Sequence, residues 1–197
     1  MFFYRYKPRS THLHKFEAEM HKRYLSKRCK LVRCITPTLH VFKFFDRNDR
    51  DWIYCAINPI IAKTFKPKRT LKANPAIYGF CSLTKIPRWV AHEVSMLYVN
   101  PDARGKGISS FIYDTVLKDK IILVSGELQN IRARAIWIKL VKNESYTVWA
   151  QDLMDLSRKD IVYIENDELS CSLKLYNDLK MKRRKKKEDI RLIAVIK

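Results

Sequence analysis

The stretch His92-Glu93-Val94-Ser95-Met96-Leu97-Tyr98-Val99-Asn100-Pro101-Asp102-Ala103-Arg104-Gly105-Lys106-Gly107-Ile108-Ser109-Ser110 joins an apolar run to a turn and then to two glycines. The run from Glu93 to Val99 predicts a largely buried strand, and Asn100-Pro101-Asp102 predicts the turn that ends it. Beyond the glycines, apolar residues recur at helical spacing and predict a helix with one apolar face over 107–117. The stretch therefore predicts a strand, a loop and a helix in that order.

The segment Arg104-Gly105-Lys106-Gly107 lies where this helix is predicted to start. The first backbone N–H groups of a helix have no partner within the helix, so they can bind an anion. Glycine lets an anion reach the backbone, while Arg104 and Lys106 add positive charge to the helix dipole. Two of the four glycines of the chain lie here, so the alternative of a merely flexible turn is the weaker interpretation. We expect a phosphate-bearing ligand at this loop.

The same residues carry a resemblance to a known family. Residues 93–108 resemble the central motif of the GNAT acyltransferase superfamily, which pairs a strand with a pyrophosphate-binding loop and helix. Residues 121–124 resemble the next strand of the family, and Asn130, Ala133, Ile136, Trp137, Lys139 and Leu140 fall on its following helix. Residues 77–83 are similar to the strand before the motif. The resemblance covers about residues 76–142 and leaves both ends of the chain unexplained.

The resemblance implies acyl transfer from acetyl-CoA, as cosubstrate, to an amine. The implied cofactor-binding residues follow the motif: Leu97, Tyr98, Val99, Arg104, Gly105, Lys106, Gly107, Ile108, Ser109 and Asn130. Ser109 stands where many members have glycine. A backbone N–H near Tyr98 and Val99 would stabilise the oxyanion, and Glu93 is the candidate base that deprotonates the amine.

One position departs from the family pattern. Trp137 occupies the place of the tyrosine that protonates the leaving thiolate, and an indole N–H is not an acid at useful pH. Tyr98, Tyr113, Tyr146 or water would have to substitute. The departure weakens the expectation of efficient catalysis without removing the acyl-CoA site.

Length and composition favour one domain with a basic character. We expect a single GNAT-like domain over residues 1–197, with an N-terminal part (1–75), an acyl-CoA-binding core (76–150) and a basic C-terminal part (151–197). The net charge of +20 predicts attraction to polyanions, nucleic acid first. No membrane span and no secretory signal is expected. Five scattered cysteines suit a reducing compartment such as the cytoplasm, and no metal site is expected, since Cys29 and Cys34 near His21 fit no familiar zinc spacing.

The remaining segments predict an α+β fold: a mixed, mostly antiparallel twisted sheet flanked by helices, with a basic helical insertion before the last strand. Strands are expected at 2–7, 39–45, 52–57, 77–83, 121–124, 145–150 and 190–196. Further helices are expected at 13–27, 128–142 and 167–187, and residues 63–75 are expected to form an exposed basic loop.

The helix expected at 167–187 ends in six consecutive cations, more than a helix dipole needs: Lys182, Arg183, Arg184, Lys185, Lys186 and Lys187. This run is the best candidate for a nucleic-acid contact, and a solvated tail is the alternative.

Two hypotheses stay open. The first is an N-acetyltransferase whose acceptor amine lies on a nucleic acid or a nucleic-acid-associated molecule. The second is a catalytically degenerate GNAT-like scaffold that binds nucleic acid or a protein partner, for example as a viral component. The glycine loop favours the first, whereas Trp137, the charge and the C-terminal insertion favour the second.

Overall fold

The computed structural model describes residues 10–47, 49–65, 74–87, 89–126, 131–153, 159–165, 168–170 and 190–197. Packing within the chain divides it into two compact units. The first unit comprises Met1–Thr84 and Ser95–Thr115, and the second comprises Lys85–Val94 and Val116–Lys197. Strand β5 (Ala91–Val99) and helix α3 (Ile108–Lys118) each pass from one unit to the other.

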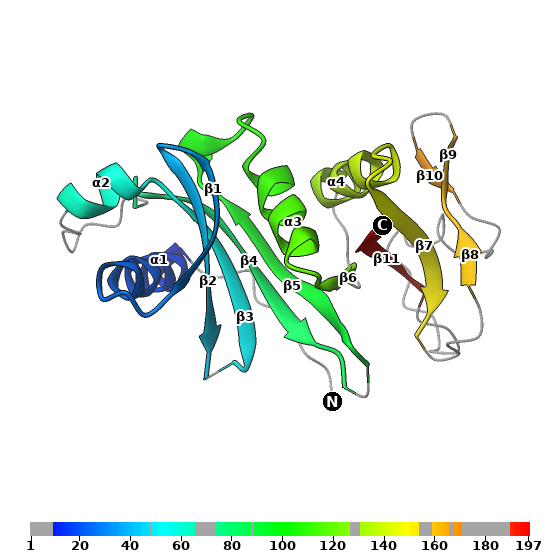
Figure 1. Cartoon of the computed structure of the whole chain (residues 1–197), viewed down its shortest axis with the longest axis horizontal. Helices are drawn as coiled ribbons and strands as arrows, with labels where there is room; N and C mark the ends of the chain where they lie inside the picture. The colour runs from blue at the N-terminus through cyan, green and yellow to red at the C-terminus, as the bar shows by residue number, and fades with distance from the viewer. Residues whose placement is uncertain are drawn as a thin grey trace. The chain divides into compact units, whose positions relative to one another are not determined.

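The first unit is a sheet with the strand order β1-β2-β3-β4-β5, in which β1 to β4 pair antiparallel (Figure 1). Its elements are α1 (Ser10–Leu25), β1 (Lys30–Thr36), β2 (Leu39–Asp46), β3 (Asp51–Ile57), α2 (Pro59–Thr64), β4 (Ile77–Lys85), the C-terminal part of β5, the 3-10 helix η1 (Pro101–Ala103) and most of α3.

Helix α1 packs its apolar stripe on one face of this sheet. Leu13, Phe16, Met20 and Tyr24 meet a core that includes Phe44, Ile53, Cys55 and Phe80. The rings of Phe16 and Phe80 lie 4.8 Å apart. Because side chains alternate along a strand, Tyr54 and Cys81 face the other way. Tyr113 of α3 lies near Cys81, so α3 covers this second face.

The second unit is a sheet with the strand order β5-β6-β11-β7-β8 and a separate hairpin of β9 and β10. Its elements are the N-terminal part of β5, β6 (Ile122–Val124), α4 (Ile131–Val141), β7 (Tyr146–Asp152), β8 (Lys159–Ile161), β9 (Tyr163–Glu165), β10 (Glu168–Ser170) and β11 (Ile190–Ile196). Strands β5 and β6 pair parallel, whereas β11 pairs antiparallel with both β6 and β7. Ala91 of β5, Val124 of β6 and Ile193 of β11 are fully buried and form a small core of this sheet.

Most of the expected elements are present, and the α+β class is confirmed. The helix expected at 13–27 is α1, the helix at 107–117 is α3, and the helix at 128–142 is α4. The strands expected at 39–45, 52–57, 77–83, 93–99, 121–124, 145–150 and 190–196 are β2, β3, β4, β5, β6, β7 and β11. The strand expected at 2–7 and most of the loop expected at 63–75 lie outside the described residues. None of the helices that the structure describes is long and apolar enough to cross a membrane.

Three features differ from expectation. The helix expected to begin at Asp167 does not begin there, because 168–170 form β10 and pair with β9; residues 171–189 lie outside the described part. Strand β1 and helix α2 were not expected. Strand β11 is last in the chain but lies between β6 and β7, and its central apolar residues Leu192, Ile193 and Ala194 are buried.

Candidate functional site

The loop after β5 is fixed by one buried side chain, Asn100. Its backbone N–H donates to the carbonyl of Tyr78 (2.9 Å), and its amide nitrogen donates to the carbonyls of Asn74 (3.3 Å) and Ile77 (3.2 Å). Its side-chain oxygen accepts from the backbone N–H of Asp102 (3.1 Å) and caps η1. Asn100 therefore ties the end of β5 to the start of β4 and sets where the glycine loop begins.

Gly105 and Gly107 both have left-handed backbone conformations, with φ of +77° and +73°. A Cβ built on Gly105 would meet nothing within 4 Å, and one on Gly107 would meet only the ring of Phe111 at 3.6 Å. Glycine is needed here for its conformation, since an L-residue in this region costs about 1–2 kcal/mol, and not because neighbouring atoms crowd it. The loop therefore offers its backbone on an open side.

The N-terminus of α3 follows directly. The first bond of the helix runs from the N–H of Phe111 to the carbonyl of Gly107 (3.0 Å). The N–H groups of the residues between them have no partner within the helix and carry the positive end of its dipole. Arg104 and Lys106 are exposed, and within the described part of the chain neither forms an ion pair. Loop, helix end and cations together form an arrangement suited to a phosphate group.

Gly79 on β4 allows the end of β5 to approach closely. A Cβ on Gly79 would lie 2.6 Å from the carbonyl oxygen of Tyr98 and 3.3 Å from a methyl carbon of Ile108. The backbone of Tyr98 and the buried side chain of Ile108 thus depend on the absence of a side chain at position 79. Gly79 is thus in close contact both with the backbone near the predicted oxyanion donors and with the first turn of α3.

Tyr98 is held by a carboxylate from α1. Its ring lies 5.4 Å from that of Phe80, and its hydroxyl hydrogen-bonds to Glu17, whose side chain is buried. Glu17 also accepts from the backbone N–H of Asn74 (3.1 Å). Burial first, and then the charge and hydrogen bond of Glu17, raise the pKa of Tyr98 to about 12. Such a phenol is a weaker acid than an ordinary tyrosine, so a role for Tyr98 in protonating a thiolate is less favourable.

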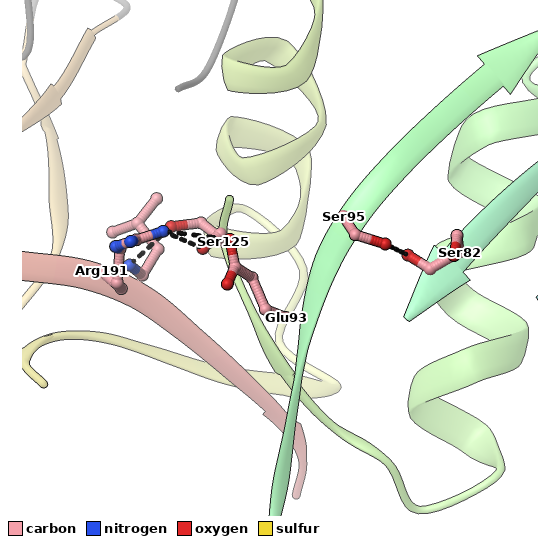
Figure 2. Close-up of polar contacts among 6 residues, drawn as sticks. Ser82, Glu93, Ser95, Ser125 and Arg191 are labelled. Carbon is pink, nitrogen blue, oxygen red and sulfur yellow. Dashed lines mark hydrogen bonds and ion pairs between the residues drawn. The ribbon is translucent and has the colours of Figure 1, made fainter. Parts of the chain in front are cut away.

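Glu93 lies in a buried ion pair of the second unit (Figure 2). Nη1 of Arg191 on β11 lies 3.3 Å from Oε1 of Glu93 and donates to the carbonyl of Ser125 (3.1 Å). Ser125 in turn bonds Leu192 twice, through its backbone N–H (2.8 Å) and its hydroxyl (3.0 Å). A carboxylate that already balances a buried guanidinium would lose this pair on taking a proton. The arrangement favours a structural role for Glu93, and its role as base stays a prediction.

Figure 2 also shows Ser95 of β5 bonded to Ser82 on β4, whose carbonyl accepts from the Ser95 hydroxyl (3.1 Å). The Ser95 hydrogen is shared between this carbonyl and Asp51 (3.1 Å), the Ser82 hydroxyl donates to Asp51 at 2.5 Å, and Thr84 donates to the other oxygen of Asp51 at 2.8 Å. Three hydroxyls thus satisfy one buried carboxylate at the end of the sheet away from the glycine loop. This cluster stabilises the strands and has no visible part in the site.

The other predicted residues lie in different surroundings. Leu97 and Val99 are half-buried on β5, and its pairing with β6 covers only Ala91 to Glu93. Ser109 is half-buried in the first turn of α3. Trp137 is buried in the second unit, and Tyr113 and Tyr146 are buried as well. Asn130 and the run from Lys182 to Lys187 lie outside the described residues.

No protein-family model matches the sequence, and no curated protein matches it. Among solved structures, one similar chain is described as a putative acetyltransferase from the GNAT family from Bacteroides thetaiotaomicron. It is 12% identical, with 92% of this chain and 84% of that chain covered and a TM-score of 0.35. This similarity is weak. We therefore base the functional inference on the motif and on the geometry of the loop.

Three residues that shape the site were not predicted from the sequence to be site residues. Asn100 before Pro101 is a recognisable cap signal, and an isolated glycine in a strand, such as Gly79, signals a close backbone approach. Glu17 gave no local signal, because it is an acidic residue on an otherwise ordinary amphipathic helix. Its partners come from β5 and from the segment before β4.

Proposed function

We propose that this chain is an acyl-CoA-dependent N-acyltransferase that transfers an acetyl group to an amine. The observation that carries the proposal is the pair of left-handed glycines in an open loop directly before α3, flanked by the exposed cations Arg104 and Lys106. An N–H-lined, positively charged loop of this kind suits the pyrophosphate of a coenzyme A thioester. The resemblance of residues 93–108 to the GNAT motif supports the same ligand.

In the proposed reaction, the amine attacks the thioester carbonyl and the thiolate leaves. The backbone N–H groups near Tyr98 and Val99 would stabilise the oxyanion that forms. The amine must be neutral to attack, so a base or solvent has to remove its proton. Because Glu93 is engaged with Arg191 and Tyr98 with Glu17, we expect water to take a larger part in these proton transfers than the motif alone suggests. A thiolate leaves readily enough for this route to be open.

The acceptor amine is proposed to lie on a nucleic acid or a nucleic-acid-associated molecule. The net charge is +20, and four carboxylates among the described residues are buried: Glu17, Asp46, Asp51 and Asp152. Arg191 is the single buried cation in the same part of the chain. The surface is therefore more positive than the net charge implies, which favours a polyanionic partner.

A second candidate function is a scaffold that binds nucleic acid without transfer. It is favoured by aromatic and cationic side chains on one face of β2 and β3. Nζ of Lys43 lies 5.4 Å from the ring of Trp52, and Trp52 makes an edge contact with the exposed ring of Phe45. A cation can bind a phosphate of a nucleic acid, and accessible aromatic rings beside it can stack on the bases. This scaffold could exist with or without a working acyl-CoA site.

Calorimetric titration of the nucleic-acid-free protein with acetyl-CoA tests the first proposal. We expect saturable binding that is lost in Gly107→Val, because a branched side chain is strained at positive φ and projects into the loop. Lys106→Gln should weaken binding, whereas Lys118→Gln, at the other end of α3, should not. S-acetylpantetheine, which lacks the pyrophosphate, should bind more weakly to the wild type and equally poorly to Gly107→Val.

Two outcomes would contradict the proposal. Retained binding in a folded Gly107→Val protein would place the ligand away from this loop. Absence of binding by the wild type would mean that the cofactor site has been lost, and the scaffold function would then be the better explanation. Circular dichroism of each variant establishes that the fold is intact.

A further inference from the structure

A cysteine and a histidine face each other across the hairpin of β1 and β2. Cys34 and His40 are directly paired in the strand register, and Sγ of Cys34 lies 3.1 Å from Nε2 of His40. Cys34 is exposed and His40 is half-buried. The two side chains lie within the first unit and take no part in the site described above.

This distance places a base within hydrogen-bond reach of a nucleophile. A thiol becomes a strong nucleophile when it loses its proton, and a neighbouring imidazole can take that proton. The ring of His40 lies 6.2 Å from that of Phe42, and Sγ of Cys34 lies 3.7 Å from the carbonyl of Thr36. The imidazole thus lies beside an aromatic ring of the same hairpin, and the carbonyl of Thr36 is a second, more distant acceptor for the thiol.

The other described cysteines are placed very differently. Cys55 and Cys81 are fully buried, and burial raises the pKa of both thiols well above the usual value. Cys29 is half-buried, and burial raises its pKa as well. Among these four free thiols, Cys34 alone combines exposure with a base at hydrogen-bond distance. Cys34 is therefore the described thiol that reagents can reach and that also has a base beside it.

We propose that Cys34 and His40 form a nucleophile–base pair that makes Cys34 a site of covalent modification by electrophiles, with hydrogen peroxide as the oxidant. The sulfur attacks one peroxide oxygen, an S–O bond forms and the O–O bond breaks. The leaving hydroxide takes the thiol's proton from the imidazolium and becomes water, which leaves Cys34 as a sulfenic acid and the peroxide reduced. This inference does not depend on the acyl-CoA site.

The test measures alkylation of each cysteine by iodoacetamide at neutral pH, followed by peptide mapping. Cys34 in the folded protein should react roughly tenfold or more faster than the same cysteine in the urea-unfolded chain, because only folding brings His40 next to it. His40→Gln should abolish this acceleration. Lys43→Gln, which removes a positive charge from the same strand, should retain it.

A second measurement uses hydrogen peroxide and a dimedone trap. Sulfenic acid should form at Cys34 in the wild type and in Lys43→Gln, and much more slowly in folded His40→Gln. Equal alkylation rates in the folded and unfolded chains, or an unchanged rate in His40→Gln, would overturn the proposal and leave Cys34 an ordinary surface thiol. Both readouts are independent of acetyl-CoA, so they separate this inference from the proposed function.

Discussion

At the scale of single residues, the contact between Tyr98 and Glu17 has the clearest chemical consequence. A buried carboxylate needs donors, and Glu17 receives them from the Tyr98 hydroxyl and the N–H of Asn74. The same bond favours the neutral form of the phenol and disfavours its ionised form. Tyr98 is thereby held as a neutral donor close to the predicted oxyanion donors, and its hydroxyl is already engaged by Glu17.

The first prediction concerns the titration of this tyrosine. Tyr98 should ionise at a pKa of about 12, and Glu17→Gln should lower that value without restoring 10, because burial is the larger cause. Tyrosine labelled with 13C at the ring carbon that carries the hydroxyl, with Tyr98→Phe to assign the signal, gives the measurement. A pKa that is the same in wild type and Glu17→Gln would mean that the two groups do not interact in solution.

The same shift predicts how stability depends on pH. Because the folded pKa lies above the unfolded value of about 10, the contribution of the protonated phenol is complete below pH 10 and is lost as pH rises towards 12. Tyr98→Phe should remove this loss, so its stability should fall less steeply than that of the wild type in alkali. The difference should stay below the ~2.7 kcal/mol that two pKa units represent, since the side chain is only half-buried. Urea unfolding at several alkaline pH values measures it.

At the scale of elements, β11 joins the second unit through a buried ion pair and a long ladder. Every residue of β11 from Ile190 to Ile196 pairs with β7, while Arg191 reaches Glu93 on β5. The side chains of Arg191 and Glu93 are 7% and 14% exposed, so neither charge is well hydrated. Removing one partner should leave the other charge buried without this counter-charge, whereas removing both should not.

This reasoning predicts a strong coupling between the two positions. Arg191→Met and Glu93→Gln should each cost about 3–5 kcal/mol, and the double variant that carries both substitutions should cost less than the sum of the two. Urea unfolding followed by tryptophan fluorescence reports mainly on the second unit, which holds three of the four tryptophans: Trp89, Trp137 and Trp149. Additive losses would show that the pair is not formed in solution. A folded Glu93→Gln protein that has lost only its transfer activity would instead support Glu93 as the base.

Element prediction succeeded where periodicity was long and failed where segments were short or exposed. Strand β1 is mostly exposed and has two register shifts, so its alternation is weak. Helix α2 has six residues, too few for a helical period, although Asn58 and Pro59 are cap signals. Leu169 fits a helical stripe as well as a strand, and pairing with β9 decides for the strand.

In the candidate site, too, the sequence predicted the residues that are close together in the chain and missed those that only folding brings together. Gly105, Gly107, Arg104 and Lys106 could be predicted because a phosphate loop is local in sequence. Glu17 could not, because its partners are brought together by the packing of α1 against β4 and β5. The pair of Cys34 and His40 also requires the hairpin register, which no single-residue pattern supplies.

At the scale of the whole molecule, the charge distribution is the dominant property. Basic side chains are exposed across α1 and the hairpins, while several acidic ones are occupied by internal hydrogen bonds. A surface of this kind releases counterions when it binds a polyanion, so its affinity should fall steeply with salt. The slope of the logarithm of the binding constant against the logarithm of the salt concentration reports how many phosphates the protein contacts. Replacing the cations of one region by neutral residues shows how much of that slope the region contributes.

The last prediction tests whether the run from Lys182 to Lys187 binds nucleic acid. Replacing Lys182 to Lys187 by serine should weaken binding to single-stranded RNA and flatten the salt slope by up to about 0.7 for each phosphate that is no longer neutralised. The matched control removes six exposed cations of the first unit by glutamine: Lys15, Lys22, Arg28, Lys30, Arg47 and Lys63. If the run binds the RNA, the control should change the slope little, because cations outside the bound surface neutralise few phosphates. A slope unchanged by the serine variant but flattened by the control would move the RNA-binding surface to the first unit, where Lys43, Phe45 and Trp52 would be the next residues to replace.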